Sequence, residues 1–286
     1  MRKFKLINEY GVEYNLQGNI PFFYDPSGLG YSFSVTYEET TGHFIETYRE
    51  VDQVEKIGTF IFSPPNAYGI YMDFVNFITT SGNLTLGYCP QDTWYYVDVD
   101  IISLEKTELS TGGVLKVPVI MAPTSPFYAP YNINLSIDKS LLESTKQYDY
   151  TYPYRYANSS RSGVLNFSVA AQIPCDFTIS IPTPISAPII TAIRMDTGDT
   201  FGEIDLSALT LNVGETLLYS TVPKVAGAQI SSSSGTRDVS DLIGLSSEYP
   251  SFFQIPPNIP IEFVLEATSL NDVIMNLSIY RYYRTV

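Results

Sequence analysis

The 286-residue sequence predicts a mainly β protein with two domains. Tyrosine occurs 23 times and phenylalanine 16 times, only 16% of the residues are charged, and β-branched residues recur in short runs. Aromatic and β-branched residues favour strands over helices. A chain of this length is long enough for two domains of ordinary size, each with a core of its own.

Short alternating segments separated by polar turns fill the region from Tyr31 to Tyr128. Alternation of apolar and polar residues is typical of a strand with one buried face. The first half is therefore predicted to hold a half-buried antiparallel sheet. The residues expected on the buried faces are Phe33, Val35 and Tyr37, then Leu84, Leu86 and Tyr88, then Val97, Val99 and Ile101.

One segment of the first half, SPPNAYGIYMDFVNFITTSG, breaks this two-residue period. Its apolar side chains recur at spacings of three and four, which is typical of an amphipathic helix packed across a sheet. Ser63 is placed to cap the helix, Pro64 suits the first helical position, and Gly82 fits just beyond the end. Gly69 costs about 1 kcal/mol relative to alanine, which implies compensating packing or a close neighbour. The predicted core face is Tyr68, Tyr71, Met72, Val75 and Ile78.

Strand-like alternation resumes after Gly163, and its spacing and turn content predict a β-sandwich. Residues 228–240 are small and polar and are expected to form a mobile loop. The predicted inward faces are Phe177, Ile179 and Ile181, then Ile261, Phe263 and Leu265, then Val273, Met275, Leu277 and Ile279.

The domain boundary is expected between these halves, where Pro, Ser and Tyr dominate. We predict a first domain over residues 1–135, a linker over 136–162 and a second domain over 163–286. Within the linker, tyrosines alternate at 148, 150, 152, 154 and 156. An edge strand that presents a row of phenols and an extended surface connector are both consistent with this pattern.

Thirty acidic residues against sixteen basic ones give a formal charge of −14, which disfavours DNA binding. The basic start of the chain lacks a signal-peptide core because Asn8, Glu9 and Glu13 interrupt it, and no window approaches a membrane span. We expect the chain to fold and assemble in a cytoplasm. A reducing compartment would keep Cys89 and Cys175 as buried thiols.

Catalytic and metal sites find little support. His43 is the only histidine and no G-x-S-x-G motif occurs, so we expect His43 to be an ordinary strand residue. One histidine and no paired cysteines argue against zinc. The stretch RMDTGDTFGEID lacks EF-hand spacing and is interpreted as a solvated hairpin loop, with an oxygen-only calcium site as the alternative. Its acids are Asp196, Asp199, Glu203 and Asp205.

The stretch FFYDPSGLGYSFSVTY raises the question of a phosphate-binding glycine loop. Such a loop needs a helix after it, whereas Gly30 is followed by a strand pattern. A tight turn fits better: Pro26 fixes φ, Asp25 can accept hydrogen bonds from its own downstream backbone, and Gly28 and Gly30 permit positive φ or close approach. Leu29 is then an apolar side chain on a loop tip, which is better explained by burial against another surface.

The order of these segments resembles the distal tail protein family of long non-contractile-tailed phages, especially those infecting Gram-positive bacteria. The series runs FKLINEYGVEYNL, FFYDPSGLGYSFSVTY, GTFIFSPPNAYGIYMDFVNFI, LTLGYCP, WYYVDVDIISLEKTE and SPFY. The second half resembles the family more loosely, through TISIPTPISAPII and the closing YRYYRTV. It departs from the family at Thr183 and Pro184, where a glycine-proline pair is expected.

The resemblance implies an N-terminal antiparallel β-sandwich ring domain with one packed helix and a C-terminal galectin-like β-sandwich. It further implies a non-enzymatic hub at the virion tail tip, assembled in the bacterial host cytoplasm as a homo-hexamer without cofactor, metal or membrane. The expected partners are the major tail (tube) protein, a tail-associated lysin or tail-tip protein, and receptor-binding or baseplate proteins. DNA would pass through the channel without specific binding, and a negative lumen would keep it from adhering.

A ring requires a heterologous interface that closes on itself. We expect the glycine-rich corner to contribute to the subunit or tube contact, with Tyr24, Asp25, Pro26, Gly28, Leu29 and Gly30 as candidates. Two alternatives stay open: a carbohydrate-binding tail module whose second domain recognises host cell-wall saccharide, and a tail-tip hydrolase. For glycoside hydrolysis, a sugar-binding cleft usually offers aromatic platforms; the single Trp94 sits in the first half, and the many tyrosines could substitute for it.

Overall fold

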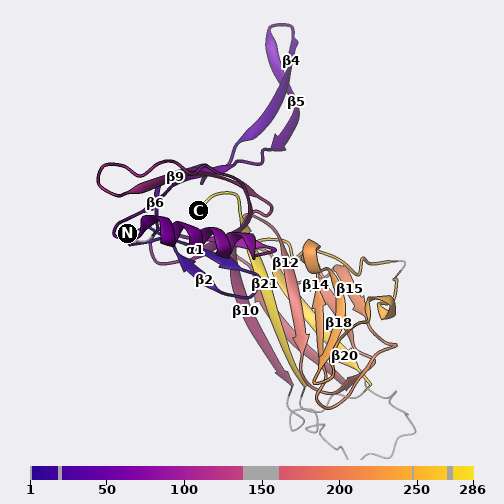
Figure 1. Cartoon of the computed structure of the whole chain (residues 1–286). Helices are drawn as coiled ribbons and strands as arrows, with labels where there is room; N and C mark the ends of the chain where they lie inside the picture. The colour runs from indigo at the N-terminus through magenta and orange to yellow at the C-terminus, as the bar shows by residue number, and fades with distance from the viewer. Residues whose placement is uncertain (1, 19–20, 138–160, 247, 269–272) are drawn as a thin grey trace, which may run out of the picture. The chain divides into compact units, whose positions relative to one another are not determined.

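The computed structural model describes residues 2–18, 21–137, 161–246, 248–268 and 273–286 (Figure 1). The predicted fold class is confirmed: the described residues are mainly β, with one α-helix among them. The chain forms two compact units, residues 1–129 with 282–286, and residues 130–281. Most of the predicted linker, including the row of tyrosines at 148–156, lies outside the described residues.

The first unit is built on an antiparallel sheet in the order β2-β1-β7-β8-β9-β6-β3. Leu86 and Val97 lie opposite each other and are buried, as the alternation predicts, whereas the predicted Tyr88 and Ile101 are only partly buried. Leu6 lies opposite Leu86 on β1 and is also buried. The strands are β1 (Lys3–Asn8), β2 (Glu13–Asn15), β3 (Phe22–Ser27), β6 (Lys56–Phe62), β7 (Leu84–Cys89), β8 (Tyr95–Leu104) and β9 (Leu115–Pro123), and the start of β10 (Phe127–Ile137) pairs with β8.

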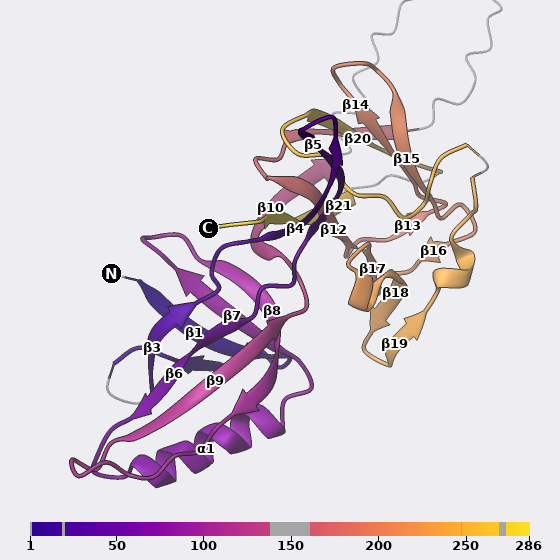
Figure 2. The same ribbon diagram turned by 90° about the horizontal axis from the view of Figure 1, so that it is seen from above.

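Helix α1 (Ala67–Thr79) packs against this sheet with one face (Figure 2). The ring of Phe74 lies 4.9 Å from that of Phe60 on β6 and 5.1 Å from that of Tyr14, which belongs to β2. Strands β6 and β2 stand far apart in the strand order. The sheet therefore curls around the helix, and Phe74 occupies the centre of the core.

The predicted start of the helix is wrong. Pro64 precedes Pro65, and a residue before proline disfavours the helical conformation, so the helix begins three residues later. Asn66 is the cap, and its side chain accepts a hydrogen bond of 3.2 Å from the backbone N–H of Gly69. A Cβ atom on Gly69 would lie 2.2 Å from the Asn66 side chain. The close neighbour inferred for Gly69 is therefore the helix's own cap.

The predicted core face of the helix is wrong at one position. Met72 is 54% exposed, whereas Phe74 is fully buried. Ala67, Tyr71 and Phe74 follow the spacing of four and three that places side chains on one face of a helix. Met72 lies about 100° away from Tyr71 around the axis and points to solvent.

The strands predicted around Phe33 and His43 do form, but not as part of this sheet. β4 (Phe33–Thr40) and β5 (His43–Val51) make a separate two-stranded hairpin, which we call the arm (Figure 1). Every residue of β5 is exposed, and no residue of β4 is buried. The prediction of a half-buried sheet is therefore wrong for this segment, because the described part of its own unit covers only the base of its apolar face.

The second unit consists of two antiparallel sheets around one core, as the sandwich prediction requires. All ten predicted inward residues from Phe177 to Ile279 are fully buried. One sheet contains β19 (Gly235–Asp238), β18 (Gly227–Ser232), β17 (Thr216–Ser220), β12 (Ile173–Ile181), β21 (Val273–Tyr283) and β10; the other contains β11 (Arg161–Ser168), β20 (Pro260–Ala267), β14 (Ile189–Arg194) and β15 (Thr200–Asp205). β13 (Ile185–Ser186) pairs with β16 (Thr210–Leu211), and two short 3₁₀ helices span Pro223–Val225 and Ser240–Leu242.

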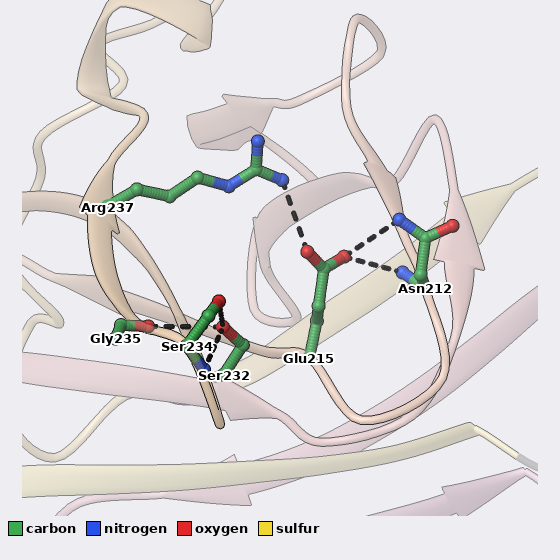
Figure 3. A network of polar contacts seen from close by, with 6 residues as sticks. All are labelled: Asn212, Glu215, Ser232, Ser234, Gly235 and Arg237. Atoms are coloured by element: carbon green, nitrogen blue, oxygen red, sulfur yellow. Dashed lines mark hydrogen bonds and ion pairs between the residues drawn. The ribbon is translucent and has the colours of Figure 1, made fainter.

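The mobile loop predicted at residues 228–240 is instead the hairpin of β18 and β19. Ala228, Ile230 and Val239 are buried, so three apolar residues hold this otherwise polar stretch on the core. Figure 3 shows how the hairpin is fastened to the preceding turn: Glu215 accepts hydrogen bonds from the backbone and side-chain N–H groups of Asn212, at 2.8 and 3.0 Å, and pairs with Arg237 at 3.4 Å.

Other features of the sequence take unremarkable places in the fold. Cys89 and Cys175 are buried and are not joined in a disulfide bond, as predicted. The acidic stretch after Arg194 is the hairpin of β14 and β15, where Arg194 pairs with Asp196 at 2.8 Å. In the described ranges, no three His, Cys, Asp or Glu side chains are grouped to hold a metal ion. Within the same ranges, no helix has the length and apolar character needed to span a membrane.

We expect Phe74→Ala to lower the free energy of unfolding of the first unit by about 3–5 kcal/mol, because it leaves a cavity at the centre of the core. Met72→Ala, at an exposed position of the same helix, should change it by no more than about 0.5 kcal/mol. Trp94 is the only tryptophan and lies in the first unit, so its fluorescence during urea unfolding reports on this unit. Equal effects of the two substitutions would contradict this orientation of the helix.

Candidate functional site

The arm is a tightly specified hairpin. Thr40 pairs with His43, which leaves Thr41 and Gly42 as a two-residue loop with φ of 51° and 78°. Positive φ at both loop residues is the geometry that matches the twist of hairpin strands. His43 is an exposed strand residue at the tip, in agreement with the sequence-based interpretation.

One face of the arm carries an apolar row that we call the stripe. Residues paired across the two strands share a face. The register shifts after Thr36, where Thr47 forms a bulge, and this shift keeps Phe44 on the same face as Phe33. Ile45 and Tyr48 lie on the opposite face. Phe44 is 73% exposed and Tyr37 is 54% exposed. The stripe consists of Phe33, Val35, Tyr37, Phe44 and Val51.

Such a stripe is unusual on a free surface. An isolated two-stranded hairpin is marginally stable in water, and its unpaired edges and apolar side chains invite association. Contiguous exposed apolar residues of this kind mark contact sites. The arm therefore presents an exposed apolar surface of the kind that is typical of contact sites.

The root of the arm, which we define as residues 28–32 and 52–56, is fastened by a carboxylate. The side chain of Asp52 accepts hydrogen bonds from the hydroxyls of Ser32, at 2.5 Å, and Ser34, at 2.6 Å. The backbone N–H of Asp52 donates to the carbonyl of Ser32 at 3.0 Å. The hydrogen bond from the Ser32 hydroxyl has the largest effect and lowers the pKa of the Asp52 carboxyl, and the hydrogen bond from the Ser34 hydroxyl lowers it further. Asp52 thus closes the base of the hairpin.

A buried lysine joins the two legs of the root. The side chain of Lys56 donates hydrogen bonds to the carbonyls of Gly28, at 2.5 Å, and Val54, at 2.9 Å. Gly28 precedes the arm and Val54 follows it. The amine also lies 5.3 Å from the ring of Phe127, and Lys56 is only 4% exposed. Burial lowers its pKa to about 8.

The glycine-rich corner, residues 24–30, leads into this root. Tyr24 pairs with Thr59 and Ser27 with Ile57, so two residues of β3 oppose one residue of β6. Asp25 adopts a positive φ of 48° in this bulge. The corner is therefore a bulged strand end as well as a turn, and the bulge redirects the chain toward the arm.

The two glycines of the corner differ in role. Gly28 has φ of 75°, and a Cβ atom there would lie 1.9 Å from the carbonyl oxygen of Glu55, so only glycine fits. Gly30 has open space around it and no positive φ. Leu29 is half-buried and packs against the core of its own unit. Some of the burial that was predicted for Leu29 therefore comes from its own chain.

Of the six predicted candidates, Gly28, Leu29 and Gly30 belong to the root. Tyr24, Asp25 and Pro26 precede it, and Tyr24 is 55% exposed. Sequence reasoning missed the stripe and Lys56. For the stripe, the segment TYEETTGHFIET contained a usable signal. Its three glutamates and its T-G turn indicate an exposed hairpin and distinguish it from the buried strands. For Lys56 no comparable signal exists, because one lysine at the start of a strand normally lies in solvent.

Comparison with protein families gives one match in the first unit. Residues 3–124 match the family model described as distal tail protein, N-terminal domain. This range contains the corner, the root and the arm. The comparison with curated proteins found no match.

Two kinds of solved structure resemble the whole chain. A chain of the phage p2 baseplate in its activated conformation matches with a TM-score of 0.72 and 18% identity, over 100% of both chains, in structures with strontium and with calcium. The SPP1 Dit protein, described as a paradigm of the hub adsorption apparatus in phages that infect Gram-positive bacteria, matches with a TM-score of 0.54 and 11% identity, over 96% of this chain and 98% of that one. These likenesses show a shared fold.

We expect the free energy of unfolding of the wild-type first unit to rise relative to that of Lys56→Met as the pH increases from 8 to 10.5. The pKa of Lys56 is about 8 in the folded chain and 10.5 ordinarily, so within this window the unfolded chain binds more protons than the folded one. Below the window both states are protonated, and the difference between the two proteins should be flat.

Urea titrations monitored by Trp94 fluorescence on both sides of this window measure the effect. Lys116→Met removes an exposed lysine of β9 and serves as the control, whose profile should run parallel to the wild type. Parallel profiles for wild type and Lys56→Met would show that Lys56 is not buried as described.

Proposed function

We propose that this chain, whose residues 3–124 belong to the distal tail protein N-terminal domain family, is a structural protein of the phage tail tip that closes into a hexameric ring. The observation that carries the proposal is the uncovered stripe on the arm of that same domain. The family match supports a tail protein, and the stripe supports association with further copies.

The arm favours a ring over a closed dimer. A ring is formed when one surface of a subunit docks on a different surface of the next and the rotation closes. An arm that stands away from its own unit is suited to this arrangement, because it can reach a neighbour while its own unit receives the arm of another copy. Burial of five apolar side chains then provides the hydrophobic contribution.

In this proposal the ring joins the major tail (tube) protein to a tail-associated lysin or tail-tip protein and to receptor-binding or baseplate proteins. It assembles in the bacterial host cytoplasm, remains at the virion tail tip, and has no enzymatic activity of its own. DNA passes through its channel without specific binding. The formal charge of −14 supports this, since a negative lumen repels phosphates.

The corner has a second place in the proposal. We assign Tyr24, Asp25, Pro26, Gly28, Leu29 and Gly30 to the contact with the neighbouring subunit or the tube. Tyr24 is the residue best suited to test this, because its side chain is exposed, whereas Leu29 also packs on its own core. Tyr24→Asp should weaken ring closure or tube attachment. A Tyr24→Asp variant that closes the ring and attaches to the tube like the wild type would show that the corner takes part in neither contact.

We expect Phe44→Asp to weaken self-association at least about tenfold, because it places a charge at the most exposed apolar side chain of the stripe and buried aromatic anchors dominate such interfaces. The thermal unfolding midpoint should stay at the wild-type value, since Phe44 makes no core contact in its own unit. Sedimentation velocity over a concentration series gives the association constants.

Thr40→Asp is the matched control, because it adds the same charge to the opposite face of the arm. It should associate more strongly than Phe44→Asp. If both variants associate as strongly as the wild type, the stripe is not part of the interface.

A further inference from the structure

Residues 282–286, which we call the strap, belong to the first unit although the chain enters them from the second. The ring of Tyr283 meets that of Tyr95 edge-on at 5.3 Å, and the ring of Tyr282 meets that of Tyr128 edge-on at 6.3 Å. Val286 packs against the core of the first unit. The strap is therefore anchored on the sheet by contacts on both sides of Arg284.

Arg284 reaches the first residue of the arm. Its guanidinium lies 5.6 Å from the ring centre of Phe33, and the guanidinium of Arg49 lies 5.0 Å from the same ring. Glu46 binds Arg49 through two hydrogen bonds of 2.9 and 2.6 Å, which reduces the repulsion between the two cations. Tyr31 adds an edge contact to Phe33 at 5.2 Å. The base of β4 is thus enclosed by side chains from the arm and from the strap.

We propose that the strap fixes the direction in which the arm leaves the first unit, with Arg284 as the positioning residue that acts through Phe33. Asp52 and Lys56 hold the two legs of the root to each other, which by itself leaves the hairpin free to swing. The returning leg is tied to β9, because the side chain of Gln53 donates to the carbonyl of Pro123 at 2.6 Å. The contact between Arg284 and Phe33 gives the outgoing strand the corresponding restraint.

The consequence is a pre-organised arm. An arm held in one direction loses less conformational freedom when it docks, so the same stripe gives a more favourable association. This consequence rests on the proposed ring, whereas the direction of the arm is a property of the single chain. The direction of the arm can therefore be measured on the single chain, and the result stays valid even if the chain forms no ring.

The test is a distance distribution between two spin labels, one at the arm tip on Thr40→Cys and one on β9 at Lys116→Cys, both exposed positions. Cys89 and Cys175 are buried and stay unlabelled.

Dilution of the spin-labelled chain with unlabelled chain suppresses dipolar signals between different copies. We expect Arg284→Ala to broaden the distribution, with a displaced-arm population roughly two- to fivefold larger, the change that loss of an exposed cation–π contact gives.

Three further variants make the result specific. Phe33→Leu should broaden the distribution as Arg284→Ala does, and Arg284→Lys should broaden it less. Arg281→Ala is the matched control, since it removes a similar contact, 5.2 Å from the ring of Tyr131 in the second unit, and should leave the distribution unchanged. Wild-type widths in both Arg284→Ala and Phe33→Leu, or equal broadening by Arg281→Ala, would overturn the proposal.

Discussion

The arrangement of the first unit depends on one buried ammonium group. A charged side chain taken out of water is costly unless it is hydrogen-bonded, and the Lys56 amine donates to two backbone carbonyls, one before the arm and one after it. Neither leg can move away without leaving a buried charge short of a partner. The constraint extends to the corner, where Gly28 brings its carbonyl to the lysine and leaves no room for a side chain beside Glu55. The place from which the arm departs is therefore determined inside the core.

What the root holds in place is a hairpin that its own unit does not cover. The sheet curls around α1 and buries Phe74 completely, whereas the stripe on the arm has the rings of Tyr37 and Phe44 exposed to solvent. In the proposed ring, another copy of the chain covers the row that this closely packed unit leaves open. In the same proposal, the contact of Arg284 with Phe33, the first residue of the stripe, keeps the arm pointed toward the neighbouring subunit.

The sequence predicted the interior better than the assembly surface, for a physical reason. Alternation at Phe177, Ile179 and Ile181 and at Phe33, Val35 and Tyr37 looks the same in the sequence. It reports that one face of a strand is to be buried, but it does not say whether the cover lies in the same chain. The helix was predictable from its period, but the width of its apolar face left Met72 and Phe74 indistinguishable, and its start depended on a cap at Asn66. Gly28 was recognisable as a constrained glycine, while Gly30 carried the same signal without the constraint. Lys56 could not be predicted, because its burial depends on carbonyls that only the fold brings together.

The measurement that tests the proposed ring most directly is the mass of the purified wild-type chain across a concentration series, with negative-stain images of the same fractions. We expect six copies in a ring with an open channel, in which each arm lies on the neighbouring subunit. A chain that stays monomeric at every concentration, with its stripe still exposed, or one that pairs into a two-fold dimer, would contradict the ring.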